Sequence, residues 1–257
     1  MLLKTKIIMI LYPNAKINIG LNVLNQRSDG YHNISSVFYP VMNLYDILEV
    51  IPSHSFSFSC SGIPISDKNN ICIKAFELLR NDFDFSNVSI HLDKRIPIGA
   101  GLGGGSSDAS FMLKALNNLF NLRISNRQLE IYALKLGADC PFFIDNTPKY
   151  VTGVGDIMTP VSLDFSRYDI QFIFSDIHVS TVQAYSDIRL NNIDSNLLDL
   201  IQKPLKSWKG NIRNDFEDSV FSKYPVLAEK KKKLYSNGAI YASMTGSGSV
   251  LYGLFNK

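Results

Sequence analysis

The chain has 257 residues, a length that suits one large domain or two small ones. Hydrophobic residues make up 46% and charged residues 19%, so the composition excludes a disordered, highly charged protein. The formal net charge of +3 is too small an excess to indicate nucleic-acid binding, which usually involves a concentrated basic surface.

The N-terminal segment contains an apolar run over residues 7–12 after a basic start. This run is too short to span a membrane, and no small-residue cleavage site follows it, so it predicts a first β-strand. The three cysteines have no CxxC spacing, which argues against a disulfide framework and a zinc site and indicates a reducing compartment. We therefore expect a soluble cytoplasmic protein with no membrane or nucleic-acid partner.

The pattern of apolar residues predicts clusters of strands and helices. Strands are expected over residues 17–23, 37–43, 46–51, 55–59, 88–92, 170–174 and 249–255. Helices are expected over residues 70–80, 106–121, 125–137, 182–188, 215–221 and 226–235. Ser106, Ser107 and Asp108 are good N-cap residues, and Ser125 with Gln128 forms a capping-box pattern that opens a helix ended by Gly137. Because there is no strict βαβ alternation, the fold class is α+β, with two lobes and a boundary near residue 160.

The glycines are unevenly distributed, since five of the 16 fall within residues 99–105. Backbone N–H groups approach a phosphate closely where side chains are absent, and a helix N-terminus adds free donors. The segment from Pro97 to Ser107, which leads into a predicted helix, has this character. The hydroxyl groups of Ser106 and Ser107 add donors for a phosphate, or one ligand for Mg²⁺.

Other known glycine-rich motifs fit this segment less well. A Walker A loop needs a lysine that is lacking here, and a protein kinase needs HRD and DFG motifs, which do not occur. Gly99, Gly101 and Gly104 formally match a dinucleotide-binding GxGxxG, but a strand does not run directly into the first glycine and no acidic residue ends a second strand about 20 residues later. A flexible linker would not lie between a buried strand and an amphipathic helix.

The pattern Pro-x-x-x-Gly-Leu-Gly-x-x-Ser-Ser before a helix resembles the phosphate loop of the GHMP small-molecule kinases. Four further segments, residues 13–18, 27–32, 137–143 and 245–249, resemble the branch of that family that acts on a CDP-linked methylerythritol. The resemblance runs from about residue 12 to residue 255, and the motifs occur in the family's order.

This resemblance implies a two-lobed GHMP kinase fold. Residues 1–160 would form an ATP-binding lobe like ribosomal protein S5 domain 2, and residues 161–257 a ferredoxin-like lobe lacking its last helix and strand. The implied reaction transfers the γ-phosphoryl group of ATP, with Mg²⁺, to the 2-hydroxyl of the methylerythritol, which requires mainly phosphate positioning, charge neutralisation and a proton acceptor. We expect a monomer or weak homodimer.

The resemblance also assigns two catalytic residues. Asp139 would accept the hydroxyl proton, although by pattern alone it reads as an N-cap. Lys16 would pair with Asp139 and stabilise negative charge, although by pattern alone it reads as a solvated strand end.

The resemblance also assigns residues that bind the substrates. Asn18 shares a strand face with Lys16 and would bind the erythritol portion. Tyr31, His32 and Tyr185 would hold the cytosine, although a core aromatic remains an alternative for Tyr185. ATP would be bound by Asn70 and Lys94, near the adenine and ribose, and by the phosphate loop, which consists of Pro97, Ile98, Gly99, Ala100, Gly101, Leu102, Gly103, Gly104, Gly105, Ser106 and Ser107.

Some features keep two interpretations. Residues 245–249 would support the phosphate loop in the family, or form an ordinary hairpin. Asp108 would help to hold Mg²⁺ through water, or cap a helix, and no Glu can be placed as a metal ligand, so the metal ligands are unassigned. Lys230 to Lys233 read as a solvated helix face.

The alternative functions are another GHMP kinase, acting on homoserine or a mevalonate phosphate, and a non-catalytic nucleotide-binding sensor. Residues 29–32 and 137–143 argue against the first, and the presence of both Lys16 and Asp139 argues against the second.

Overall fold

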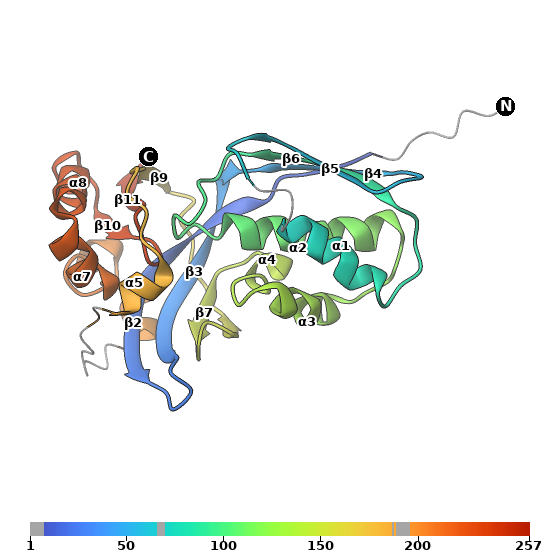
Figure 1. The fold of residues 1–257 in the computed structure, drawn as a ribbon. Coiled ribbons are helices and arrows are strands. Elements are labelled where there is room, and N and C mark those ends of the chain that lie inside the picture. Colours follow the sequence, from blue (N-terminus) through green and yellow to red (C-terminus); the bar gives the residue numbers. More distant parts are fainter. Residues whose placement is uncertain (1–7, 66–69, 187, 189–195) are drawn as a thin grey trace. The chain divides into compact units, whose positions relative to one another are not determined.

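The structure is a computed structural model that describes residues 8–65, 70–186, 188 and 196–257 (Figure 1). As far as they are described, residues 1–15, 41–98 and 103–146 form one compact unit, here called unit 1. Residues 16–40, 99–102 and 147–257 form a second, called unit 2. The division of the chain into lobes at residue 160 stays a prediction.

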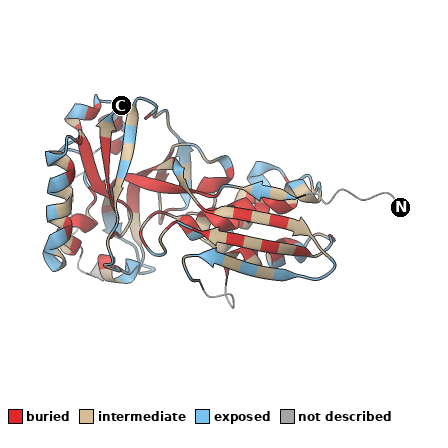
Figure 2. Cartoon of the chain, turned by 90° about the horizontal axis from the view of Figure 1, so that it is seen from above, coloured by how far each residue is buried: buried red, intermediate tan, exposed pale blue. Residues whose placement is uncertain are grey.

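Unit 1 contains a four-stranded sheet in the order β1-β4-β6-β5. Its strands are β1 (Met9–Leu11), β4 (Ile47–Pro52), β5 (Ser57–Gly62) and β6 (Val88–Lys94). The neighbours are antiparallel except for the parallel pair β5 and β6. Burial alternates along these strands, as Figure 2 shows, because Val88, Ile90 and Leu92 of β6 face the core and are fully buried. The strands predicted over residues 46–51, 55–59 and 88–92 are confirmed.

Helices α1 (Ile71–Arg80), α2 (Gly104–Leu119), α3 (Asn126–Leu136) and α4 (Phe142–Asp145) cover one face of this sheet (Figure 1). The Ser125–Gln128 capping box is present, and Gly137 ends α3 as predicted. The predicted start of α2 is wrong. Its N-cap is Gly103, at φ +70°, so Ser106, Ser107 and Asp108 lie inside the helix rather than at its cap.

Unit 2 contains two sheets. One has the order β2-β3-β7-β8, with β2 (Asn14–Gln26), β3 (His32–Tyr45), β7 (Lys149–Thr152) and β8 (Ile157–Pro160); the first two residues of β2 and the end of β3 from Val41 onward belong to unit 1. The other has the order β10-β11-β9, with β9 (Tyr168–Ile173), β10 (Tyr241–Met244) and β11 (Leu251–Asn256), all antiparallel. Strand β10 was missed because its four residues carry no clear alternation, since all four are buried.

Among the described residues of unit 2, the helices are α5 (Thr181–Ser186), α6 (Leu197–Ile201), the 3₁₀ helix η2 (Leu205–Ser207), α7 (Phe216–Lys223) and α8 (Pro225–Ser236). Of the helix predicted over residues 182–188, residue 187 lies outside the described residues. A core shared by α5, α7, α8 and the sheets includes Val179, Phe216, Leu227 and Met244. In the part of the chain that the structure describes, no helix is both long and apolar enough to cross a membrane.

Candidate functional site

The glycine-rich segment changes direction at three glycines with left-handed backbone conformations. Gly99, Gly101 and Gly103 have φ values of +65°, +76° and +70°, and an L-residue with a side chain is strained in this region. Helix α2 then begins at Gly104 with no side-chain cap. Its first N–H groups have no partner within the helix, which is the arrangement that binds an anion.

Two glycines of α2 differ in what surrounds them. A Cβ atom on Gly104 would lie 2.8 Å from Cγ2 of Ile96, so this position has to be glycine for packing. A Cβ atom on Gly105 would meet nothing within 4 Å outside its own helix. The exposed position of Gly105 leaves the backbone open to a ligand.

Within unit 2, the turn at residues 245–249 packs against Gly101. The Thr245 hydroxyl donates to the Gly101 carbonyl at 3.0 Å, and a Cβ atom on Gly101 would lie only 2.1 Å from the Thr245 carbonyl oxygen. The turn connects β10 and β11, which pair directly. Both interpretations of this segment are therefore confirmed, since it is a hairpin turn and also supports the glycine-rich segment.

Lys16 lies in β2 and is buried, with only 3% of its surface exposed. Its Nζ donates to Oδ1 of Asn18 at 2.5 Å and lies 4.5 Å from the centre of the Phe38 ring. The interpretation of Lys16 as a solvated strand end is wrong, and the shared face of Lys16 and Asn18 is confirmed. The Asn18 amide also donates to Ser36 at 2.9 Å, so both side chains are held in fixed positions.

Asp139 lies in unit 1, in the turn between α3 and α4, and is half-buried. This turn is fastened to α2, because the Ser110 hydroxyl donates to the Cys140 carbonyl at 2.6 Å. Burial raises the pKa of the Cys140 thiol to about 12, against the lowering effect of its hydrogen bond with Ser106. The turn that carries Asp139 is thus packed against the first turns of α2.

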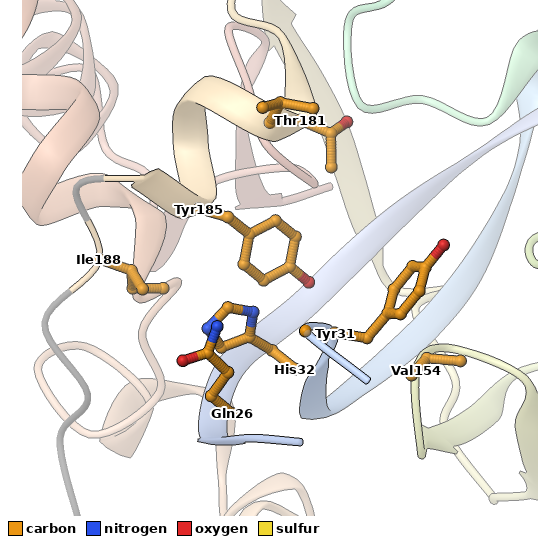
Figure 3. Close-up of a pocket in the computed structure, with 9 residues that line it drawn as sticks. Gln26, Tyr31, His32, Val154, Thr181, Tyr185 and Ile188 are labelled. Carbon is orange, nitrogen blue, oxygen red and sulfur yellow. The ribbon is translucent and has the colours of Figure 1, made fainter. Parts of the chain in front are cut away.

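A pocket of about 730 Å³ opens on unit 2, between the β2–β3 hairpin and α5 (Figure 3). Its lining residues are Gln26, Gly30, Tyr31, His32, Val154, Thr181, Val182, Tyr185 and Ile188. The structure therefore brings together the three residues predicted to hold a base, Tyr31, His32 and Tyr185.

The aromatic rings of this pocket have distinct positions. His32 stacks on Tyr185, with ring centres 4.9 Å apart and planes 19° from parallel. A base inserted between two rings needs about 7 Å, two carbon contact distances, so none fits between these two as they stand. Tyr31 is 66% exposed and lies apart from the stacked pair in Figure 3. A flat ligand can therefore stack on the exposed ring of Tyr31, whereas Tyr185 contacts both His32 and, with ring centres 4.8 Å apart, Phe216.

The two residues predicted near the adenine have structural partners in unit 1. Asn70 caps α1, because its Oδ1 accepts the N–H of Cys72 at 2.8 Å. Lys94 is buried, and its Nζ forms ion pairs with Asp46 at 2.5 Å and with Asp108 at 2.8 Å. Burial lowers the pKa of Lys94, but the charges of Asp108 and Asp46 outweigh this effect and raise it. Burial raises the pKa of Asp108 well above its usual value, against the opposing charge of Lys94.

Near the start of α2, two buried polar atoms lack a hydrogen-bond partner. They are Oγ of Ser107 and Oδ1 of Asp108, and both residues are at least 98% buried, with 0% and 2% of their surface exposed. A buried oxygen without a partner costs free energy unless a ligand, ion or water satisfies it. Hydroxyl and carboxylate oxygens are suitable for Mg²⁺. Among the described residues, no group of three or more His, Cys, Asp or Glu side chains could hold a metal ion.

Sequence reasoning missed three residues that hold the site in place: Asp46, Ser110 and Asn214. The Asn214 amide donates to the carbonyls of Met244 and Gly246 at 2.9 and 2.8 Å, and so orients the turn behind Gly101. No local sequence signal marks these three residues. The contacts that hold the site join each of them to a residue at least 30 positions away in the sequence.

Two regions of the chain match a known protein family. Residues 70–146 match the model of the GHMP kinases N terminal domain, and residues 193–257 match that of the GHMP kinases C terminal domain. The chain is 50% identical to the 4-diphosphocytidyl-2-C-methyl-D-erythritol kinase of Azobacteroides pseudotrichonymphae, over 97% of this chain and 94% of that protein. It is 49% identical to the protein of the same name from Bacteroides fragilis strain ATCC 25285, over 96% of this chain and 92% of the relative.

The chain is also similar to a solved structure of a protein with the same name. The crystal structure of a 4-(cytidine 5'-diphospho)-2C-methyl-D-erythritol kinase superposes with a TM-score of 0.80 at 31% identity. The match covers 96% of this chain and 90% of that chain.

Proposed function

Because the chain belongs to the GHMP kinase family, and within it to the 4-diphosphocytidyl-2-C-methyl-D-erythritol kinases, we propose that it transfers the γ-phosphoryl group of ATP to the 2-hydroxyl of 4-diphosphocytidyl-2-C-methyl-D-erythritol. The products are ADP and the 2-phosphate of the substrate, an intermediate of the non-mevalonate isoprenoid pathway. The observation that carries the choice of substrate is the aromatic pocket of Tyr31, His32 and Tyr185, because a phosphate loop is common to small-molecule kinases whereas this pocket suits a nucleobase.

The phosphates of ATP are held by the glycine-rich segment. Residues between Pro97 and Ser107 supply backbone N–H groups, and the N-terminus of α2 adds the positive end of a helix dipole. Gly105 supports this role because its exposed backbone has no side chain in front of it. Asn70 and Lys94 lie next to the adenine and ribose in this proposal.

The transfer itself needs a proton acceptor and a positive charge. Asp139 accepts the proton of the attacking hydroxyl, which its position in a turn fastened to α2 supports. Lys16 stabilises the negative charge that develops during transfer, and its burial supports this role because a buried ammonium is effective where water is excluded.

ATP is used as its magnesium complex, so the metal enters as part of the substrate. Bound Mg²⁺ neutralises phosphate charge. Ser107 and Asp108 suit the metal or its waters, because each has a buried oxygen without a hydrogen-bond partner.

The second substrate is bound mainly by unit 2. The cytosine stacks on Tyr31 beside the His32–Tyr185 pair, and Asn18 binds the erythritol portion. The enzyme works in the cytoplasm, as a monomer or weak homodimer.

The test is ADP release by the purified protein with Mg²⁺-ATP and each of three acceptors. We expect turnover with 4-diphosphocytidyl-2-C-methyl-D-erythritol and none with homoserine or phosphomevalonate. Turnover with one of the latter two alone would reject the proposed substrate. Nucleotide binding without turnover of any acceptor would instead indicate a sensor.

A further inference from the structure

A buried cluster of three ionisable side chains lies beside the start of α2. Lys94 bonds to one oxygen of Asp46 and one of Asp108, and the three side chains are 4%, 0% and 3% exposed. Removing such charges from water costs several kcal/mol per ion, and apolar side chains of similar size often serve stability as well or better. The cluster is therefore poorly explained by stability alone.

Asp46 makes more contacts than its pairing with Lys94. Its second oxygen accepts the N–H groups of Arg95 and Ile96, at 2.6 and 2.8 Å. One carboxylate therefore binds three consecutive residues, 94, 95 and 96, at the point where β6 ends and the segment toward Pro97 begins. Asp46 is itself fixed, because its N–H donates to the Pro13 carbonyl at 2.9 Å and it directly precedes β4.

The other side of the cluster reaches the helix that follows the glycines. Lys94 bonds to Asp108, in the second turn of α2, and its Nζ lies 3.0 Å from where a Cβ atom on Gly104 would be. The side chain of Ile96 closes on the same glycine. Two of the three residues bound by Asp46, Lys94 and Ile96, are thus residues against which the N-terminus of α2 packs.

We propose that Asp46 is a positioning residue for the nucleotide. Through Lys94 and the N–H groups of Arg95 and Ile96, it holds the segment that enters the glycine loop in fixed register with the helix that leaves it. The inference rests on the proposed function, since it assumes that this loop binds the phosphates of ATP. Asp46 does not touch the nucleotide in this proposal, and its effect is transmitted by the positions of the Lys94 side chain and of the backbone of residues 94–96.

The test compares Asp46→Asn with the wild type. This variant keeps the size of the side chain and an acceptor for the N–H groups, but removes the charge opposite Lys94. We expect the dissociation constant of ADP, measured by calorimetry, and the KM for ATP to rise about tenfold or more, since a small displacement of binding groups has effects of this order. The KM for the CDP-linked substrate should stay within about twofold, because its pocket lies in unit 2.

A matched control separates positioning from stability. Asp215 is a partly buried carboxylate of unit 2 whose Oδ2 accepts the N–H of Val23 at 2.8 Å, so it also ties two distant segments together. Asp215→Asn should lower the melting temperature and leave the dissociation constant of ADP unchanged. If Asp46→Asn lowers only the melting temperature, as the control does, the proposal is wrong.

A second variant tests the proposal if Asp46→Asn does not fold. Asp46→Glu keeps the charge but moves the carboxylate by one methylene, and should also weaken ADP binding about tenfold. Unchanged ADP affinity in this variant would overturn the proposal. A wild type that binds ADP but does not phosphorylate the CDP-linked substrate would reject the proposed function, and the ADP measurements would still decide the role of Asp46.

Discussion

Lys16 and Asp139 have different surroundings, which suit different roles. Lys16 is held rigidly inside unit 2, with its Nζ on Asn18 and over the ring of Phe38. Asp139 is half-buried in a turn of unit 1. The proposed transfer needs a fixed cation and a carboxylate that accepts a proton, and these are the roles proposed for Lys16 and Asp139.

We expect Asp139→Asn to lower kcat about 10²-fold or more, because an amide cannot accept the hydroxyl proton. The dissociation constant of ADP should stay within about twofold, since the loop is unchanged. Steady-state kinetics and calorimetry measure the two quantities. Asp145→Asn, at the end of α4, is the control and should retain wild-type kcat. A wild-type kcat for Asp139→Asn would exclude Asp139 as the base.

The pKa values of the cysteine thiols predict which cysteines react with iodoacetamide at pH 8. Burial raises the pKa of Cys140 to about 12 and that of Cys72 well above its usual value, so neither forms a reactive thiolate at pH 8. We expect iodoacetamide to modify only Cys60 in the native protein at pH 8 and all three cysteines after denaturation. Mass spectrometry of peptides measures the modification. Labelling of native Cys140 as fast as Cys60 would show that the turn beside Asp139 opens readily.

At the scale of elements, the glycine-rich segment is shaped by supports that are distant in sequence. The β10–β11 turn contacts Gly101, and Asn214, just before α7, fixes that turn through two carbonyls. The Asp46 cluster acts on the N-terminus of α2 in unit 1. If the segment binds phosphate as proposed, these supports reduce the free-energy cost of binding, because the backbone they hold is ordered beforehand.

Two glycine substitutions distinguish a glycine needed for packing, Gly101, from a glycine proposed to lie against the phosphates, Gly105. Gly101→Ala should destabilise the fold by about 1–2 kcal/mol or more, because a side chain is strained at φ +76° and would collide with Thr245. Gly105→Ala has space and should fold normally, but its methyl group covers the N–H groups offered to phosphate. Melting curves and ADP affinity measure both effects. Wild-type ADP affinity in Gly105→Ala would show that the phosphates do not bind there.

At the scale of the whole molecule, both units are built from separate stretches of the chain. The chain passes between the units at residues 15–16, 40–41, 98–99, 102–103 and 146–147, and two of these points bracket the four residues from Gly99 to Leu102. The folding of each unit therefore depends on residues far apart in sequence.

Ligand binding should stabilise the folded protein by mass action. ADP at 100 times its dissociation constant should raise the free energy of unfolding by about 2.7 kcal/mol. For a chain of this size each kcal/mol raises the melting temperature by about 2–4 °C. Differential scanning calorimetry measures the shift, and Gly105→Ala at the same ADP concentration is the control, with a smaller shift. No shift in the wild type would contradict nucleotide binding to the folded state.

The sequence by itself determined the local chemistry: the α+β class, most helices, the capping box at Ser125 and the shared face of Lys16 and Asn18. Periodicity, capping and glycine clusters act over a few residues, so they can be read without the fold. The family resemblance, carried by short motifs in order, identified the small-molecule kinase. The roles assigned to individual site residues stay predictions.

Only the tertiary structure decided which residues support the site. A charged residue at the start of a strand usually lies in water, and Asp46 and Lys16 gave no local sign of burial. Their environment comes from segments that the chain brings together from tens to hundreds of residues away, such as the partners of Asn18 at Thr245 and of Asp46 at Lys94. Long-range contacts of this kind are set by packing of the whole unit, and for that reason the pattern of neighbouring residues does not encode them.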